Sequence, residues 1–457
     1  MKSKLAIILF AVISLTIVIG KKSQWQKAHV LTWDKSGYYI YLPAIFIYHD
    51  LQGFSFSPTI ADKYHPAGDI KWYYLYEYPA GKRLNKYSIG TCFFELPFFL
   101  CADLYCRLSN APRDGYSPPY QLLVAISTLF WVIMGLLILR RFLLYYFSDD
   151  AVCLTLLFIA FGTNLFYYSV FDQGMSHPYS FFLFSAVLFL THKIYNNYKL
   201  RYLILLGITL GFITIVRPVN IIIAIIPLFW MVYNTRLFRD RLLFIKSKKT
   251  PHLLLALLFF CLVLSVQMSY WHLITGHWIH FSYEGESFNF LRPRLWDGLM
   301  SYRKGWFVYT PMALVCLAGF ITLFRKNKAY IPSLAVFWIL MIYIVFSWRM
   351  WYYGGSFGCR ALVETFAVGA FLLASLVGKI TALKSTKLKS AFLTLLTLIT
   401  FLNVFQSYQY SLSIIHWDRM TQAYYWKVFG KTHIDEDATK YLMSDEDYNK
   451  ADQDDQK

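Results

Sequence analysis

The chain has 457 residues, of which 57% are hydrophobic and only 15% are charged. This balance excludes an ordinary soluble globular protein. Repeated apolar runs between short charged clusters indicate instead a polytopic, all-α protein embedded in a lipid bilayer. The formal net charge of +18 would suit a nucleic-acid partner. However, Lys and Arg lie mostly in short clusters between apolar runs, as the positive-inside rule requires, so we expect no nucleic-acid partner.

The first apolar run covers residues 5–20, with Lys2 and Lys4 before it and Lys21-Lys22 after it. It could be the apolar region of a signal peptide, but no A-x-A cleavage site follows. We therefore expect residues 1–20 to be an uncleaved signal anchor, the first transmembrane helix, with its N-terminus in the cytoplasm.

Residues 21–119 are rich in Tyr, Trp, Gly and Pro and form the predicted first extracytoplasmic loop. Within this loop, residues 37–49 (GYYIYLPAIFIYH) are apolar but too short and too aromatic to cross a bilayer. We predict that they form an interfacial helix lying in the membrane plane. Residues 89–106 are long enough to span, yet they contain two acids and a proline.

Ten further apolar runs build the predicted transmembrane bundle over residues 120–410. They cover about residues 120–146, 150–170, 177–195, 201–216, 219–235, 253–271, 307–324, 331–347, 361–378 and 391–409. Basic clusters occupy alternate connections between them, which assigns those connections to the cytoplasm. Asp34 and residue 110 then both lie outside, so we predict that 89–106 is a juxtamembrane or re-entrant segment. The count is about 11 transmembrane helices, followed by an extracytoplasmic acidic tail over 411–457. Residues 431–457 hold nine acids and few apolar residues, so we expect a solvated, partly disordered end there.

Two features inside the bundle lead to narrower expectations. Arg217-Pro218 interrupts the apolar stretch 201–235, which predicts either a ligand-facing break in a helical hairpin or a plain turn with a snorkelling arginine. The seven cysteines show no zinc-ligand or disulfide spacing, so we expect free, buried thiols and no metal.

The predicted outer face gathers most of the chemically able side chains. Asp34 heads the aromatic segment WDKSGYYIYLP and is either a catalytic base or the cap of an interfacial helix. The remaining candidates for substrate binding are Tyr38, Lys86, Asp172, His177, Arg217, Lys304, Trp351 and Arg360. Charges at mid-bilayer cost roughly 2.5–3.5 kcal/mol each on insertion scales, so such a gathering indicates a substrate site. Taken singly, these residues also have structural interpretations. His177 could be an interfacial histidine, Lys304 and Arg360 could be phosphate-facing anchors, and the Trp/Tyr run at 348–353 could be an interfacial aromatic belt.

The order of these elements resembles the GT-C superfamily of integral-membrane glycosyltransferases, which use polyprenyl-phosphate-linked sugars. Protein O-mannosyltransferases, aminoarabinose transferases and Rgt-type lipopolysaccharide transferases are among its members. The matching stretches are WDKSGYYIYLP, NKYSIG followed by PFF, GTNLFYYSVFDQGMSHPYSFF, VRPVN, SYRKGWFVYTP and WYYGGSFGCRALVE. Two departures stand out: lysine follows Asp34 where many relatives have a second acid, and the folded C-terminal domain of many members is missing.

The resemblance implies inverting sugar transfer on the extracytoplasmic (periplasmic) face of the plasma membrane. Asp34 is then the base, while Lys86, Arg217, Lys304 and Arg360 contact the donor phosphate. Asp172 and His177 would orient the acceptor or line the pocket, and Tyr38 and Trp351 would contact the sugar or the prenyl chain. A phosphate leaving group needs no general acid. A monophosphate donor needs no bridging metal, and we expect no cofactor.

Three other functions compete with this one. A transporter or flippase for lipid-linked glycans or a small solute would share the broken helices and buried charges. It would not need the long first outer loop that begins with an acid. A polysaccharide polymerase or ligase would place its basic loop late in the chain, and a scaffold protein would leave the buried charges unexplained.

Overall fold

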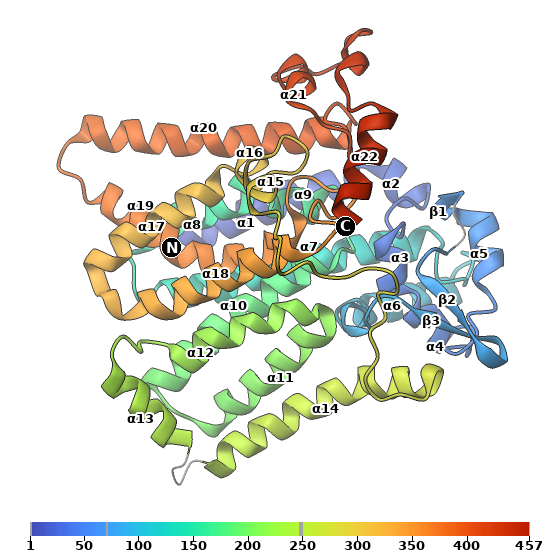
Figure 1. Cartoon of the computed structure of the whole chain (residues 1–457), viewed down its shortest axis with the longest axis horizontal. Coiled ribbons are helices and arrows are strands. Elements are labelled where there is room, and N and C mark those ends of the chain that lie inside the picture. Colours follow the sequence, from blue (N-terminus) through green and yellow to red (C-terminus); the bar gives the residue numbers. More distant parts are fainter. Residues whose placement is uncertain (1, 70–71, 246–249, 457) are drawn as a thin grey trace.

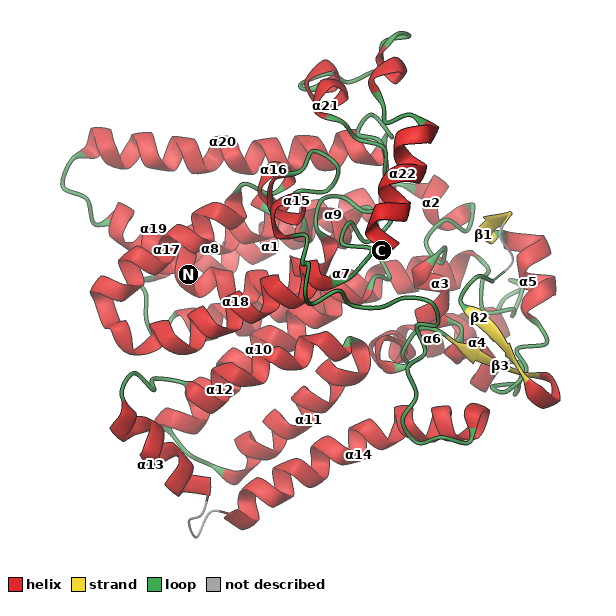
Figure 2. Ribbon diagram, viewed as in Figure 1, coloured by secondary structure: helices red, strands yellow, loops and turns green. Residues whose placement is uncertain are grey.

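The computed structural model describes residues 2–69, 72–245 and 250–456, and nearly all of its regular structure is helical (Figure 1, Figure 2). The predicted class, a mostly helical membrane protein, is confirmed.

Within the described chain, the strands lie near the start and helices make up the rest of the regular structure. The first part contains α1 (Lys2–Gly20), α2 (Lys22–Gln26), α3 (Asp34–Tyr39), α4 (Tyr41–Phe46), α5 (Ser57–Tyr64), β1 (Pro66–Asp69), β2 (Leu75–Tyr78), η1 (Pro79–Gly81), β3 (Lys82–Asn85) and α6 (Gly90–Leu108). The middle contains α7 (Pro118–Leu143), α8 (Asp149–Gly162), α9 (Leu165–Val170), α10 (Ser176–Asn196), α11 (Leu200–Val216), η2 (Pro218–Ala224), α12 (Ile225–Phe229), α13 (Thr235–Ile245) and α14 (Thr250–Thr275). The last part contains α15 (Leu295–Met300), α16 (Trp306–Tyr309), α17 (Met312–Asn327), η3 (Lys328–Tyr330), α18 (Ile331–Ser347), η4 (Arg360–Thr365), α19 (Phe366–Thr381), α20 (Thr386–Ser411), α21 (Gln422–Val428), η5 (Ala438–Tyr441) and α22 (Asp445–Gln456).

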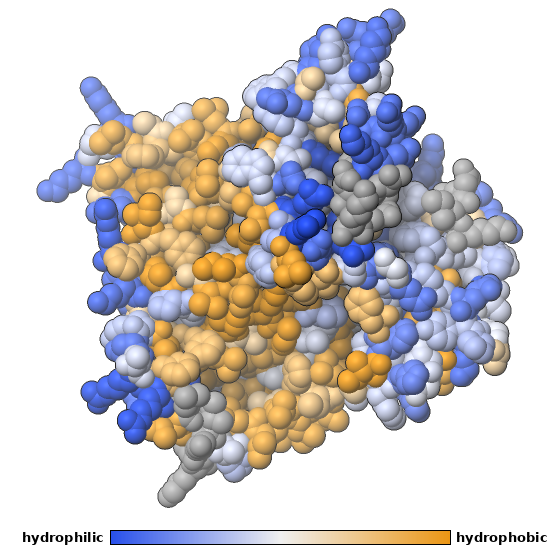
Figure 3. All heavy atoms as spheres, viewed as in Figure 1, coloured by the Kyte–Doolittle hydropathy of each residue, from blue (hydrophilic) through white to orange (hydrophobic). Residues whose placement is uncertain are grey.

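The long helices form one bundle in which α7 packs on α10, α11 on α14, and α17 on α19. The turns between α17 and α18 and between α19 and α20 lie at one end of the bundle, together with α13 (Figure 1). The opposite end carries α3–α6, the antiparallel β2–β3 pair and the C-terminal helices. Orange, apolar side chains cover the face between these two ends, and blue side chains mark both ends (Figure 3). This banding is what a bilayer requires of a spanning bundle.

Six helical stretches of the described chain are long and apolar enough to cross a membrane: 2–20, 118–143, 250–275, 312–347, 360–381 and 386–411. The finer count of eleven is not confirmed. Several predicted spans are short in the structure; α8 has 14 residues and α11 has 17. At about 1.5 Å per residue these helices reach roughly 21–26 Å, less than a bilayer core of about 30 Å.

The segment predicted as an interfacial helix over 37–49 differs from that expectation. It forms two short helices, α3 and α4, and residues 38–44 are buried. Tyrosine hydroxyls satisfy backbone carbonyls there: Tyr39 donates to Gly115 over 2.5 Å, and Tyr41 donates to Tyr87 over 2.5 Å. These aromatic side chains fill the core of the first loop instead of entering lipid headgroups.

Residues 90–106 belong to α6, one continuous helix and not a re-entrant hairpin. Its acids are buried and partnered: Glu95 accepts from Tyr179 over 3.2 Å, and Asp103 accepts from Arg107 and Arg113 over 2.8 and 2.7 Å. The helix is not among the six stretches, and its position outside the span count stays a prediction.

The acidic tail is structured, which corrects the expected partial disorder. We call residues 412–456 the C-terminal unit. Its Asp418 accepts two hydrogen bonds from the guanidinium of Arg303, over 3.0 and 3.3 Å, and a third from the hydroxyl of Tyr448 over 2.7 Å. Arg419 pairs with Asp445 over 2.5 Å. Asp435 and Asp437 likewise pair with Lys431 and Lys427, so some of the tail's acids have basic partners.

The remaining expectations are met in part. Arg217-Pro218 does break the helix, because α11 ends at Val216 and a 3₁₀ segment begins at Pro218. All seven cysteines are free, but Cys101 and Cys261 are exposed and not buried.

Candidate active site

Asp34 opens α3 at the polar end of the bundle, and its side chain is only 16% exposed. The preceding residue, Trp33, has a φ of 53°, a conformation that non-glycine residues rarely adopt. The amide of Trp33 donates to the Pro66 carbonyl over 2.7 Å, which holds this turn in place. The sharp turn directs the carboxylate of Asp34 away from the chain that leads into it.

Two tyrosine hydroxyls converge on one oxygen of Asp34. Tyr73 donates to Oδ1 over 2.5 Å and Tyr87 donates to the same atom over 2.7 Å. Gly37 makes this approach possible, because a Cβ at that residue would lie 2.3 Å from the Tyr87 ring. The side chain of Asn85 donates to the Gly37 carbonyl over 2.7 Å and fixes the segment further.

Arg360 contacts the other oxygen of Asp34, with Nη2 lying 2.7 Å from Oδ2. The guanidinium is positioned by the segment 348–360, which crosses the polar end. Asn164 donates to the carbonyls of Phe357 and Cys359 over 3.3 and 3.2 Å, and Gly358 adopts a φ of 59° between them. Arg360 is thus anchored by backbone contacts as well as by its charge.

Asp34 is ionised in this setting. Burial would raise the pKa of its carboxyl, but the charge of Arg360, the two tyrosine hydrogen bonds and the charge of Lys86 outweigh burial. Together they hold the pKa of Asp34 well below its usual range. Burial and the neighbouring carboxylate raise the pKa of Tyr73 and Tyr87, so both phenols stay protonated and donate.

A second charged group joins three elements. His177 of α10 and Glu364 of η4 have no exposed side-chain surface, and Nδ1 of His177 lies 2.9 Å from Oε2 of Glu364. Arg217, at the helix break, lies 3.4 Å from the other oxygen of Glu364. Its Nη1 lies 3.2 Å from Nε2 of His177. Arg217 is therefore held by a carboxylate and does not snorkel.

Two more ion pairs complete the network. Lys86 pairs with Glu286 in the long loop after α14. Lys35, next to Asp34, pairs with Asp172 over 2.6 Å. Tyr38 is buried near the charges of Asp34, Arg217 and Arg360, with its ring centroid 4.7 Å from that of Tyr87.

Two predicted site residues lie apart from this network. Lys304 is buried and donates to the backbone carbonyls of Ser356 and Trp417, so it joins the segment 348–360 to the C-terminal unit. Trp351 lines a separate pocket beside Arg303. The other seven predicted residues fall into neighbouring groups: Asp34 with Arg360, His177 with Arg217 through Glu364, Lys86 with Glu286, and Asp172 with Lys35. The seventh, Tyr38, lies close to the charges of Asp34, Arg217 and Arg360.

The sequence patterns missed several members of the site. Glu364 stands alone in the apolar stretch ALVETFAVG, and that isolation was an available signal. Glu286 and Tyr73 lie in segments without a comparable pattern. Lys35, which departs from the GT-C pattern, binds Asp172 in the structure.

This arrangement can perform two chemical tasks. The ionised carboxylate of Asp34 can accept a proton from a hydroxyl group. The guanidinium groups of Arg360 and Arg217 and the ammonium of Lys86 can stabilise an oxyanion in a water-poor setting. All three cations already contact a carboxylate of the chain, so an incoming anion must compete with those acids.

Comparisons of the chain with protein-family models, with curated proteins and with solved structures found no match.

Proposed function

We propose that the chain is an integral-membrane glycosyltransferase, acting on the extracytoplasmic face of the plasma membrane. It moves a sugar from a polyprenyl-phosphate donor to an acceptor hydroxyl, with inversion. The observation that carries this proposal is the pairing of Asp34 with Arg360 over 2.7 Å at the polar end of an apolar bundle. A base and a phosphate-binding cation side by side are what this reaction needs.

In the proposed step, the acceptor oxygen attacks the anomeric carbon while Asp34 takes its proton. The bond from that carbon to the phosphate oxygen breaks, and its electron pair leaves with the phosphate. Because phosphate is a weak base, no general acid is required, unlike the expulsion of a sugar alkoxide. A well-placed general base typically contributes about 10²–10⁴-fold to the rate.

Arg360 takes part both in the deprotonation by Asp34 and in the departure of the phosphate. While the charge of Arg360 faces Asp34, the carboxylate of Asp34 is ionised but weakly basic. A donor phosphate that accepts hydrogen bonds from Arg360 would take up part of its charge, because phosphate and guanidinium suit each other geometrically. The pKa of Asp34 would then rise, and the base would gain strength only when the donor is bound.

The first test compares wild-type chain with Asp34→Asn in lipid nanodiscs, using polyprenyl-phosphate sugars with labelled sugar and a panel of acceptors. Asp34→Asn should reduce sugar transfer by at least about 100-fold, the lower end of a general base's contribution. Asp62→Asn is the matched control, since Asp62 is an exposed acid of the same loop.

Two results would contradict the proposal. One is a rate of sugar transfer by Asp34→Asn equal to that of wild type, in a variant whose stability is also unchanged. The other is that the chain, reconstituted in liposomes, moves the labelled lipid from one leaflet to the other but transfers no sugar to any acceptor. That result would favour the transporter alternative.

A further inference from the structure

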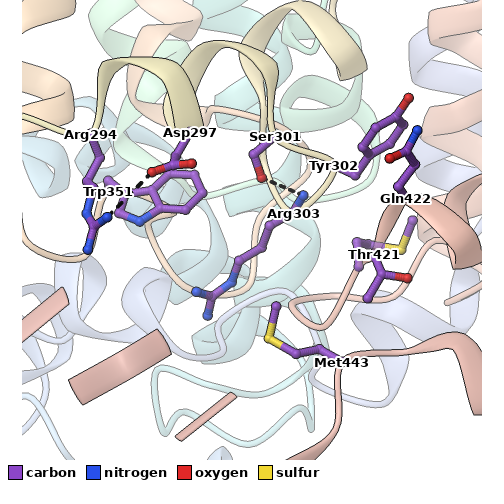
Figure 4. A pocket seen from close by; sticks show the side chains of 10 residues that line it. Arg294, Asp297, Ser301, Tyr302, Arg303, Trp351, Thr421, Gln422 and Met443 are labelled. Atoms are coloured by element: carbon purple, nitrogen blue, oxygen red, sulfur yellow. Dashed lines mark hydrogen bonds and ion pairs between the residues drawn. The ribbon is translucent and has the colours of Figure 1, made fainter. Parts of the chain in front are cut away.

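A pocket of about 480 Å³ lies at the polar end, between the α15 region and the C-terminal unit (Figure 4). Its volume falls within the roughly 300–1,000 Å³ typical of small-ligand sites. One wall carries Arg294 and Asp297 with the indole of Trp351 beside them, and Gln422 of α21 lies on the opposite side, next to Tyr302. We infer that this pocket binds a neutral saccharide. If the proposed function is correct, that saccharide is the sugar acceptor.

The charges around the pocket argue against an anionic ligand. Arg303, at its centre, donates twice to Asp418 and lies 3.5 Å from the Tyr352 ring centroid. Arg294 faces Asp297 at 3.8 Å. Each guanidinium that lines the pocket in the described chain therefore has a carboxylate partner, and the local charge sums to zero. A phosphate or an acidic glycan would find the charge of both lining cations already compensated.

The polar groups suit hydroxyls, which both donate and accept hydrogen bonds. The carboxylate of Asp297 accepts, Arg294 donates, and the amide of Gln422 does both. The side chains of Asp297 and Arg294 are 43% and 41% exposed, so they are accessible to a ligand. Trp351 also lines the pocket, but it is only 6% exposed, so a ligand contacts the rim of its indole and not an open ring face.

The pocket is joined to the candidate active site through one segment. Residues 348–360 supply Trp351 to the pocket and Arg360 to Asp34. Lys304 follows Arg303 and binds the carbonyl of Ser356 inside that same segment. A ligand that contacts Trp351 therefore touches the element that sets the position of Arg360, which is the arrangement expected of an acceptor subsite.

The test measures saccharide binding directly, without donor, by saturation-transfer NMR on the full chain in nanodiscs free of glycoside detergents. The probes are neutral mono- and disaccharides, with sugar phosphates and a short-chain lipid as comparison ligands. Asp297→Asn and Gln422→Ala should each weaken saccharide binding about tenfold, because the first replaces a charged acceptor oxygen with an amide N–H donor and the second removes the amide altogether. Trp296→Phe is the control, since Trp296 neighbours Asp297 but is 74% exposed and does not line the pocket.

Equal saccharide binding by wild type and both pocket variants would overturn the inference, as would binding of the anionic or lipid probes alone. The outcome is separable from that of the proposed function. A chain that binds saccharides through this pocket but transfers no sugar would refute the transferase and leave the pocket assignment standing. An active transferase whose acceptor KM is unchanged in Asp297→Asn would refute the acceptor pocket alone.

Discussion

At the scale of single residues, Asp34 owes its charge state to its neighbours and not to water. Its side chain is 16% exposed, yet three groups within 2.7 Å favour the carboxylate. A buried charge of this kind persists only when its partners outweigh the loss of hydration. The state of Asp34 therefore depends on Arg360 and the two tyrosines, and changing any one of them should be visible in the pH dependence of the chain.

Arg360→Gln should move the acid limb of the pH–rate profile to higher pH. Without the guanidinium, burial is less strongly opposed and the pKa of Asp34 rises. The carboxylate is then protonated at pH values where the wild-type base is ionised. The check is kcat/KM, which reports the pKa of the free enzyme, measured across about pH 4–8, with the exposed Arg292→Gln as control. Superimposable profiles for wild type and Arg360→Gln would show that Arg360 does not control the base.

Gly37→Ala should damage the site through Tyr87. The added methyl would lie 2.3 Å from that ring, so the ring must move and its hydrogen bond to Asp34 is lost or lengthened. Overpacking of this kind costs about 1–3 kcal/mol of stability. We expect a lower melting temperature and reduced transfer activity. The control is Gly20→Ala, because no atom lies within 4 Å of a Cβ at Gly20. Equal melting temperatures for the two variants would contradict the packing argument.

The residues of the site could be named from the sequence far better than they could be paired. Asp34 and Arg360 both stood out as charges beside aromatic runs, but nothing local to either indicates the other, because their contact depends on the packing of distant helices. The acids that hold the candidate phosphate-binding cations carry no comparable sequence pattern, with the exception of Glu364. Glu364 and Glu286 balance Arg217 and Lys86, and a polar group in a low-dielectric site requires such partners.

At the scale of elements, η4 and the helix break after α11 depend on each other. Glu364 lies in the 3₁₀ turn that precedes α19, and Arg217 lies at the end of α11 just before Pro218. Gly90, at the start of α6, packs on the same break, where a Cβ would lie 2.3 Å from the Ile215 carbonyl oxygen. The proline signalled the break in the sequence. Glu364 marked η4 as unusual, but nothing in the sequence indicates that η4 meets this break, because their contact depends on the packing of distant helices.

Glu364→Gln should weaken the contact between η4 and the helix break after α11. The change removes the carboxylate that pairs with Arg217 at the end of α11, and breaking a buried ion pair costs about 3–5 kcal/mol of stability. We expect a clear fall in melting temperature, measured in nanodiscs, and a raised KM for the donor because Arg217 is no longer held in place. His177→Gln, which can keep a hydrogen bond to Glu364, should cost less. If Glu364→Gln is as stable as wild type, the guanidinium of Arg217 must be hydrated and the prediction is wrong.

At the scale of the whole molecule, an apolar bundle carries its charged network at one end, and the C-terminal unit packs on that end (Figure 1, Figure 3). Composition and periodicity sufficed to predict the bundle. The folded tail could not be predicted, because its acids indicate disorder until Arg303 and Arg419 are brought next to them. The buried amine of Lys304 completes this junction, since it binds the carbonyls of Ser356 and Trp417 on either side.

The junction at Lys304 should make the stability of the chain depend on pH above neutrality. Burial lowers the pKa of Lys304 to about 7, against about 10.4 in an unfolded chain. From about pH 7 to 10 the unfolded state therefore binds more protons than the folded state, and the free energy of unfolding rises with pH. Relative to Lys304→Gln, which cannot titrate, wild type should gain several degrees in melting temperature over that range. Other titrating groups cancel in this difference, so parallel curves would mean that Lys304 keeps an ordinary pKa and that its charge is hydrated at the junction.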